Sequence, residues 1–183
     1  SRKGEISRMM PVCMEMADRL GRKVIIAGAP SRRQDDYQPY IGERDNVSVV
    51  FGRTYDILRY ADAAVINSGT ASLEAALIGT PQVVCWSTSK LTYFVGRYIL
   101  RVLDHIKYIS LGNLCIDKLA FRELIQDEFN SDELCREVTR LCEDDACRAQ
   151  MQQDYRLIRE SLGGSGASRA VAREMIAAVK ELR

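Results

Sequence analysis

The stretch of residues 65–86 constrains the fold of this chain more than any other. The apolar run 63–66 predicts a buried strand, and the small and polar residues 67–70 predict a turn after it. Gly79 suits the left-handed position that ends a helix, and Pro81 prevents the helix from continuing. The stretch therefore predicts a strand at 63–66, a helix from the turn to Ile78, and a second buried strand at 82–86.

The turn before this helix carries residues that suit a phosphate. The first turn of a helix has unpaired backbone N–H groups and partial positive charge, and Gly69 leaves that backbone open because it has no side chain. The hydroxyl groups of Ser68 and Thr70 flank it, and either can cap the helix. Glu74, about one turn further along, suits a sugar or ribose hydroxyl. The pattern thus fits a phosphate or pyrophosphate site.

An ordinary capped connection fits the same residues, and for the pattern alone it is the commoner case. The turn has neither the lysine of a Walker loop nor the glycine spacing of a Rossmann fingerprint. Further sequence features are therefore needed to choose between the two interpretations.

Strands and helices alternate through the first part of the chain. Apolar and β-branched runs at 23–29 and 46–51 predict two more strands, with a short helix between them and another helix after Gly52, through Tyr60. This alternation is typical of parallel βαβ units, whose ligands bind at the carboxyl ends of the strands. The turns at Gly52 and at 68–70 both follow strands, so we expect them to face one crevice that holds a nucleotide.

The composition favours a cytoplasmic protein without a nucleic-acid partner. The formal net charge is only +1, and no apolar run is long enough to cross a membrane. The six cysteines and the single histidine, His105, show no metal-ligand spacing, so we expect reduced thiols, no metal and no cofactor. With 183 residues, the chain can bury the core of one domain.

The later part of the chain predicts one more strand, at 108–111, and then helices. Before that strand, the residues from 90 to about 102 predict an apolar, basic helix that suits core packing or a domain interface, with a membrane surface as the second interpretation. From residue 130 onward we expect helices only, and the last of them carries an apolar stripe. If that stripe is exposed, it can drive self-association.

Four blocks of the sequence resemble the lipid-A-disaccharide synthase family, in the order in which that family has them. The block Ser68-Gly69-Thr70-Ala71-Ser72-Leu73-Glu74-Ala75-Ala76-Leu77, with Gly79-Thr80-Pro81 behind it, resembles the family's donor-site block. The resemblance covers residues 1 to about 126. The other three blocks are Ser1-Arg2-Lys3-Gly4-Glu5-Ile6, Leu91-Thr92-Tyr93 with Gly96-Arg97, and Ile109-Ser110-Leu111-Gly112-Asn113-Leu114.

The resemblance implies a GT-B architecture, in which two Rossmann-like domains enclose a cleft, and this chain resembles the C-terminal, donor-binding half. We therefore expect an α/β fold with a Rossmann-like parallel sheet flanked by helices. Residues 1–183 should form a single UDP-sugar donor-binding domain, truncated from a two-domain protein, with residues 130–183 as its helical tail. The first helix has no strand before it, which agrees with a cut upstream.

The resemblance also implies roles for individual residues. It puts Arg2 beside the donor phosphates, the nucleotide base against the backbone at Gly52, and Asn113 within reach of a phosphate or sugar oxygen. Lys118 stands where the family typically has an arginine, so it supplies positive charge but not the pair of parallel hydrogen bonds that an arginine can form. Leu119 replaces the glutamate that the family has next. The predicted donor site consists of Arg2, Gly52, Ser68, Gly69, Thr70, Ala71, Glu74, Asn113 and Lys118, with no catalytic residue and no metal in this half.

The implied reaction is the transfer of 2,3-diacylglucosamine from UDP-2,3-diacylglucosamine to 2,3-diacylglucosamine 1-phosphate, with release of UDP. The implied partners are these two lipids, the missing N-terminal domain, a second copy in a homodimer, and the surface of the inner membrane. Two other interpretations remain open at this point. The chain could belong to another UDP-sugar enzyme, such as an epimerase or a different glycosyltransferase, or it could be a non-catalytic interaction domain.

Overall fold

The fold is taken from a computed structural model, which describes residues 3–67, 69–88, 107–163 and 166–181. The described strands are β1 (Val24–Gly28), β2 (Val47–Phe51), β3 (Ala64–Ile66), β4 (Gln82–Trp86) and β5 (Glu123–Ile125). The described α-helices are α1 (Lys3–Leu20), α2 (Gln38–Ile41), α3 (Thr54–Tyr60), α4 (Gly69–Ile78), α6 (Leu111–Ile116), α7 (Ser131–Glu143), α8 (Asp145–Leu162) and α9 (Ala167–Glu181). Two 3₁₀ helices are η1 (Gln34–Asp36) and η4 (Gln126–Glu128).

All described strands pair in parallel, as the alternating pattern predicts. β1 pairs with β2, from Val24 opposite Val47 to Gly28 opposite Phe51. A second sheet has the order β3-β4-β5, and each crossover between its strands contains a helix. The α/β, Rossmann-like fold class is therefore confirmed, with the strands divided between a two-stranded and a three-stranded sheet.

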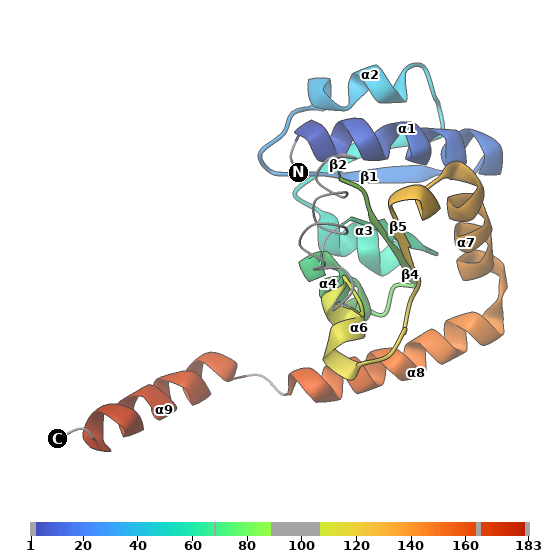
Figure 1. The fold of residues 1–183 in the computed structure, drawn as a ribbon. Helices are drawn as coiled ribbons and strands as arrows, with labels where there is room; N and C mark the ends of the chain where they lie inside the picture. The colour runs from blue at the N-terminus through green and yellow to red at the C-terminus, as the bar shows by residue number, and fades with distance from the viewer. Residues whose placement is uncertain (1–2, 68, 89–106, 164–165, 182–183) are drawn as a thin grey trace, which may run out of the picture.

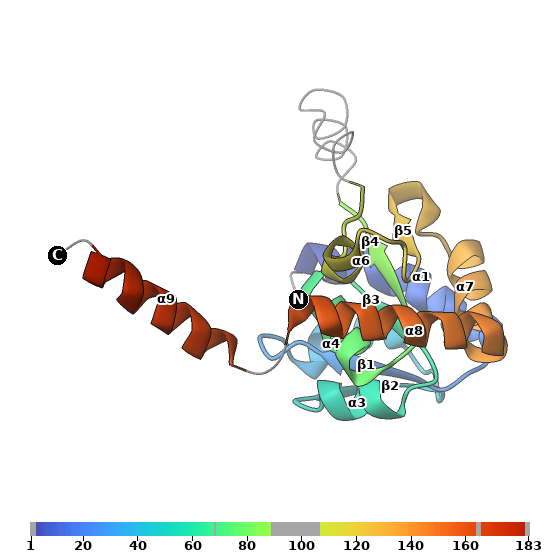
Figure 2. The same cartoon turned by 90° about the horizontal axis from the view of Figure 1, so that it is seen from below.

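Helices cover both sheets (Figures 1 and 2). The α1 and α2 helices lie over the β1–β2 sheet, while α8 runs across the far end of the molecule beside α4 and α6. The buried face of α1 is apolar at helical spacing, which is why this helix forms and packs as the sequence predicts. Its members include Ile6, Met10, Met14 and Ala17, which form one core cluster with Tyr37, Ile41 and Val47.

The helix that follows residue 130 begins where the sequence predicts. The side chain of Asn130 accepts a hydrogen bond from the backbone N–H of Glu133 at 3.0 Å and so caps α7. Gly79 ends α4 with φ of 99°, the left-handed conformation expected for that glycine.

The predicted strand at 108–111 is wrong. Residues 107–110 are irregular, α6 begins at Leu111, and the last described strand is β5, further along the chain. The backbone N–H groups of Ile109 and Ser110 donate to the side chain of Glu123 at 2.7 and 2.9 Å, instead of to a neighbouring strand. A carboxylate partner therefore replaces strand pairing here. The helix predicted at 90–102 lies outside the described residues.

The α9 helix projects away from the rest of the molecule (Figures 1 and 2). The chain reaches it past Gly163 and Gly166, both with positive φ. Four of its apolar side chains are exposed, namely Val171, Met175, Ile176 and Val179. Among the described residues, no helix combines the length and the apolar character that crossing a membrane requires.

A buried polar cluster fixes the junction between α4, β4 and α8. The hydroxyl of Tyr155, on α8, donates to the carbonyl oxygen of Thr80 at 2.9 Å and accepts from the amide of Gln82 at 3.1 Å. The same amide donates to the carbonyl oxygen of Ser72 at 2.9 Å. Tyr155 and Gln82 are both fully buried. The cluster therefore ties α8 to both ends of the connection between α4 and β4.

Replacing Tyr155 by phenylalanine should lower the free energy of unfolding by about 2 kcal/mol, because Gln82 and Thr80 lose a partner while they stay buried. Urea denaturation followed by circular dichroism measures this change. The matched control is Leu157→Ala, an exposed position on the same helix, which should cost less than about 1 kcal/mol. An unchanged denaturation midpoint for Tyr155→Phe would contradict the prediction.

Candidate functional site

The start of α4 lies at the carboxyl end of β3, and it is not buried in the core. Thr70 is exposed, and Gly69 and Ala71 are half-buried. Ser72, one residue further, is fully buried, and its hydroxyl donates to the carbonyl oxygen of Gly69 at 2.6 Å. The beginning of α4 is therefore accessible from outside, while the side chain of Ser72 points into the protein interior. Ser68 lies outside the described residues.

The turn at Gly52 follows β2 and precedes α3. Gly52 is exposed with φ of 71°, and a Cβ added there would meet no atom within 4 Å, so its backbone is open to a ligand. The next helix is linked to α4 by one hydrogen bond, from the hydroxyl of Tyr55 to the carboxylate of Glu74 at 3.3 Å. This contact joins the start of α3 to the middle of α4, and the turns before both helices follow parallel strands, as expected for turns that face one side of a sheet.

The beginning of α1 lies near the same edge of the three-stranded sheet. The guanidinium of Arg8 donates from Nε to the carbonyl oxygen of Ser87 at 3.3 Å, one residue beyond the carboxyl end of β4. Arg2, the residue expected beside the donor phosphates, lies outside the described residues.

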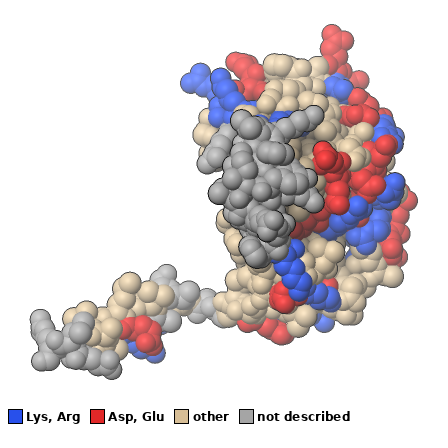
Figure 3. Space-filling view, viewed as in Figure 1, with Lys and Arg blue, Asp and Glu red and all other residues tan. Residues whose placement is uncertain are grey.

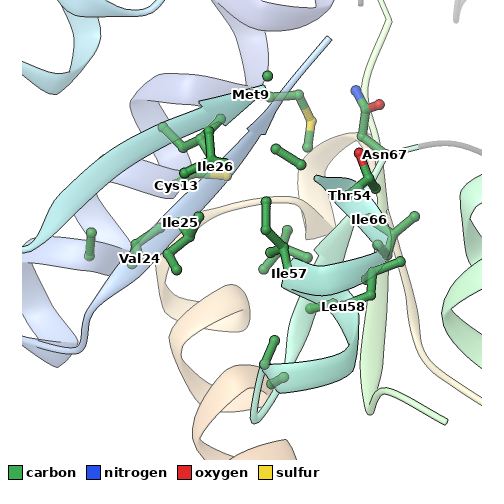
Figure 4. Close-up of a pocket in the computed structure, with 18 of the residues that line it drawn as sticks. Met9, Cys13, Val24, Ile25, Ile26, Thr54, Ile57, Leu58, Ile66 and Asn67 are labelled. Atoms are coloured by element: carbon green, nitrogen blue, oxygen red, sulfur yellow. The ribbon is translucent and has the colours of Figure 1, made fainter. Parts of the chain in front are cut away.

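An apolar cavity of about 1000 Å³ opens beside these turns. Its walls come from α1, β1, α3 and β3, and Figure 4 shows Met9, Ile25 and Ile57 among the side chains around it. Thr54, at the start of α3, and Asn67, just after β3, lie together at one side of it (Figure 4). An open space therefore reaches the segment that leads into α4, and its inner walls are too apolar for a phosphate.

Cys13, the cysteine of α1 that lines this cavity, is not a candidate nucleophile. Burial raises the pKa of the Cys13 thiol to about 12, so the thiol stays protonated at neutral pH. Elsewhere in the described part of the chain, no group of three or more His, Cys, Asp or Glu side chains is arranged to hold a metal ion.

The start of α6 packs directly against the start of α4. A Cβ built on Gly69 would lie 3.5 Å from Cγ of Leu111 and 4.0 Å from the carbonyl oxygen of Ile109. Gly112, also in α6, lies so close to the ring of Phe121 that a Cβ there would come within 2.6 Å of it. The missing side chain of Gly112 therefore allows α6 to approach the ring of Phe121, while at Gly69 a Cβ would make only ordinary contacts with α6.

Asn113 is completely buried, and its side chain is fully used within the chain. Its amide donates to the carbonyl oxygen of Phe121 at 2.9 Å and to the carboxylate of Glu123 at 2.8 Å. Its oxygen accepts from the backbone N–H of Ala120 at 2.8 Å. In this arrangement Asn113 holds α6 against the chain before β5 and has no donor left for a ligand.

Glu123 is the residue of this region that the sequence analysis missed. Its carboxylate accepts hydrogen bonds from the backbone N–H groups of Ile109 and Ser110, the hydroxyl of Ser110 and the amide of Asn113. In the sequence it follows Arg122 and resembles one of a pair of surface charges. The signal that the sequence offered was the position of this acidic residue directly before two apolar residues, Leu124 and Ile125.

Lys118 is engaged by an acidic residue of α8. Its ammonium group lies 2.6 Å from a carboxylate oxygen of Asp154, whose side chain is only 3% exposed. The amide of Gln150 donates to the same oxygen at 3.3 Å. Any contact between Lys118 and a phosphate competes with this pairing.

Charges of both signs are interspersed on the side of the molecule that carries α7 (Figure 3). Arg122 lies 2.7 Å from Glu133, and the side chains of Arg136 and Arg140 pair with Glu133 and Glu137 along the helix. These pairs neutralise each other locally, so this face offers no extended basic surface of the kind that binds polynucleotides.

Asn113→Ala should lower the free energy of unfolding by about 3 kcal/mol, because it removes a hydrogen-bond partner of the buried carbonyl of Phe121 and of the N–H of Ala120, and one of the four donors to the carboxylate of Glu123. The matched control is Asn130→Ala, which removes only an exposed helix cap and should cost about 1 kcal/mol. Urea denaturation compares the two variants. Equal losses of unfolding free energy in the two variants would contradict the conclusion that all hydrogen bonds of the Asn113 side chain stabilise the fold.

Comparison with known proteins gives one consistent family. The model of the lipid-A-disaccharide synthetase family matches residues 1–178. A lipid-A-disaccharide synthase of Geobacter sulfurreducens is 34% identical over 178 residues, which cover 94% of this chain and 45% of the relative. The synthase of Nitrosococcus oceani is 35% identical, with 97% and 46% covered, and that of Myxococcus xanthus is 35% identical, with 96% and 46% covered. The chain thus spans about half the length of the curated relatives that it matches.

Proposed function

The chain belongs to the lipid-A-disaccharide synthase family, and on this premise we propose that it is the donor-binding half of a glycosyltransferase. The reaction transfers 2,3-diacylglucosamine from UDP-2,3-diacylglucosamine to 2,3-diacylglucosamine 1-phosphate and releases UDP. The share of this chain is to bind the nucleotide of the donor and to stabilise UDP as it leaves.

One observation carries the proposal: the accessible start of α4 lies beside the open turn at Gly52. Thr70 is exposed at the start of α4, and a Cβ added at Gly52 would meet no atom within 4 Å. The hydrogen bond between Tyr55 and Glu74 links α3, which follows Gly52, to α4. Backbone N–H groups at the start of α4 suit a diphosphate. The backbone at Gly52 suits the edge of a uracil ring, and Glu74 suits a ribose hydroxyl between them.

In the proposed reaction, this half of the enzyme stabilises the negative charge of the leaving UDP. As the bond to the sugar breaks, charge builds up on the diphosphate, and fixed N–H dipoles at Gly69, Thr70 and Ala71 oppose it as an oxyanion hole does. Arg2 and Lys118 add positive charge, Lys118 when it exchanges Asp154 for the diphosphate. The hydroxyl of Ser68 supports the same group, and Asn113 contributes by holding α6 in place.

The acceptor hydroxyl needs a general base, and we assign none to this chain. The missing N-terminal domain supplies the base and the other wall of the cleft, so the isolated chain binds UDP weakly and does not catalyse. The exposed apolar side chains of α9 support contact with a second copy or with that domain. A position at the inner membrane surface follows from the acylated substrates.

A different UDP-sugar enzyme, epimerase or transferase, would use the same nucleotide site with another sugar. Thermal denaturation in the presence of several UDP-sugars separates these cases. We expect UDP itself to account for most of the shift, and a shift that is largest for a non-acylated UDP-sugar would favour the other enzyme. A non-catalytic interaction domain would show no shift with any of them.

Titration calorimetry of the 183-residue chain with UDP tests the proposed site. The double variant Ser68→Ala with Thr70→Ala should weaken UDP binding about tenfold, because two hydroxyl contacts with a charged phosphate are lost. Thr139→Ala, a half-buried threonine of α7, is the matched control and should bind UDP as the unchanged chain does. Equal affinities for all three proteins would exclude a phosphate at this turn.

A second prediction concerns turnover. The isolated chain should form no disaccharide from UDP-2,3-diacylglucosamine and 2,3-diacylglucosamine 1-phosphate, because the proposed base lies in the other half. Thin-layer chromatography of the lipid products measures this. Disaccharide formation by the chain alone would refute the division of roles between the halves.

A further inference from the structure

We propose that Glu123 is a positioning residue for the diphosphate site at the start of α4. It acts through the segment 109–113, which it fixes and against which Gly69 packs. This inference rests on the proposed function, since it concerns the same site. It assigns a role to a residue that contacts no part of the expected ligand.

The carboxylate of Glu123 is the centre of a buried hydrogen-bond cluster. One oxygen accepts from the backbone N–H of Ile109 at 2.7 Å. The other accepts from the backbone N–H of Ser110 at 2.9 Å, from its hydroxyl at 2.5 Å and from the amide of Asn113 at 2.8 Å. Ser110 and Asn113 are fully buried, and Glu123 is 9% exposed, so water cannot readily replace these bonds.

The segment held in this way forms the support of the α4 start. The carbonyl oxygen of Ile109 and the side chain of Leu111 are the nearest atoms outside α4 to the face of Gly69. A Cβ added to Gly69 would be in ordinary van der Waals contact with these atoms, so residues 109–111 lie directly beside the first turn of α4. The position of the first N–H groups of α4 therefore depends on where residues 109–111 lie.

Binding a diphosphate through backbone N–H groups demands accurate placement. A displacement of about 0.5 Å is enough to weaken such a site. Because a carboxylate accepts all four bonds at once, a neutral amide of the same shape cannot replace it: its nitrogen would face donors instead of accepting from them. Glu123→Gln therefore disturbs the support of Gly69 with almost no change of volume.

The test compares the two ends of the nucleotide. Calorimetric titration of the 183-residue chain with UDP and with uridine separates the phosphate end from the base end. Glu123→Gln should raise the dissociation constant for UDP about tenfold and leave that for uridine within about twofold, because the base is proposed to bind at Gly52, which follows a strand of the other sheet and takes no part in the hydrogen bonds of Glu123.

The matched control is Glu137→Gln, which neutralises a carboxylate that is even more buried than that of Glu123 and that pairs with Arg140 and Arg122 in place of the α6 segment. It should leave the ratio of the two dissociation constants unchanged, even if it lowers the midpoint of thermal unfolding. Should Glu123→Gln fail to fold, Ser110→Ala removes one of the four bonds and should raise the dissociation constant for UDP about threefold.

The outcomes separate this inference from the proposed function. If the unchanged chain binds UDP but Glu123→Gln and Ser110→Ala weaken UDP and uridine equally, or weaken neither, Glu123 is only a structural residue and the inference is overturned. If the unchanged chain does not bind UDP, the proposed function itself falls, and the inference falls with it.

Discussion

The buried ring of Tyr155 is the contact on which the arrangement of the site depends. Its hydroxyl joins α8 to Thr80 and Gln82, at the junction between α4 and β4. Its ring lies edge-on to Phe121, with centroids 6.2 Å apart, and Phe121 in turn fills the space that Gly112 leaves in α6. One aromatic side chain thus connects α8, the α4–β4 connection and α6, so an accessible turn at the start of α4 can rest on a rigid support.

The sequence allowed the β3–α4–β4 unit to be predicted because its signals are local. A short apolar run, a polar turn, a glycine C-cap and a proline each act within a few residues, and the glycine indeed adopts the left-handed conformation. The cap at Asn130 could be predicted for the same reason. The positions of Gly52 and Gly69 at strand ends follow from the parallel pairing that this alternation specifies.

The structure of residues 107–130, the described segment before α7, could not be predicted, since long-range contacts decide it. Residues 108–111 have the apolar character of a strand, but the carboxylate of Glu123 binds two of their N–H groups and a helix begins instead. Asn113 resembled a ligand-binding amide at a strand end, while the fold gives all its hydrogen bonds to neighbours in the chain. Which partner a polar side chain finds depends on the tertiary fold.

The division of the strands into two sheets has a consequence for how the chain behaves among its own copies. Among the described strands, β1 and β3 have one partner each, and both line the apolar cavity, with α1 and α3 as its other walls. An unpaired strand edge invites pairing with another molecule. Here both strands line a cavity whose other walls come from α1 and α3 of the same chain, so a strand from a second molecule that paired with either edge would have to share this space with those two helices.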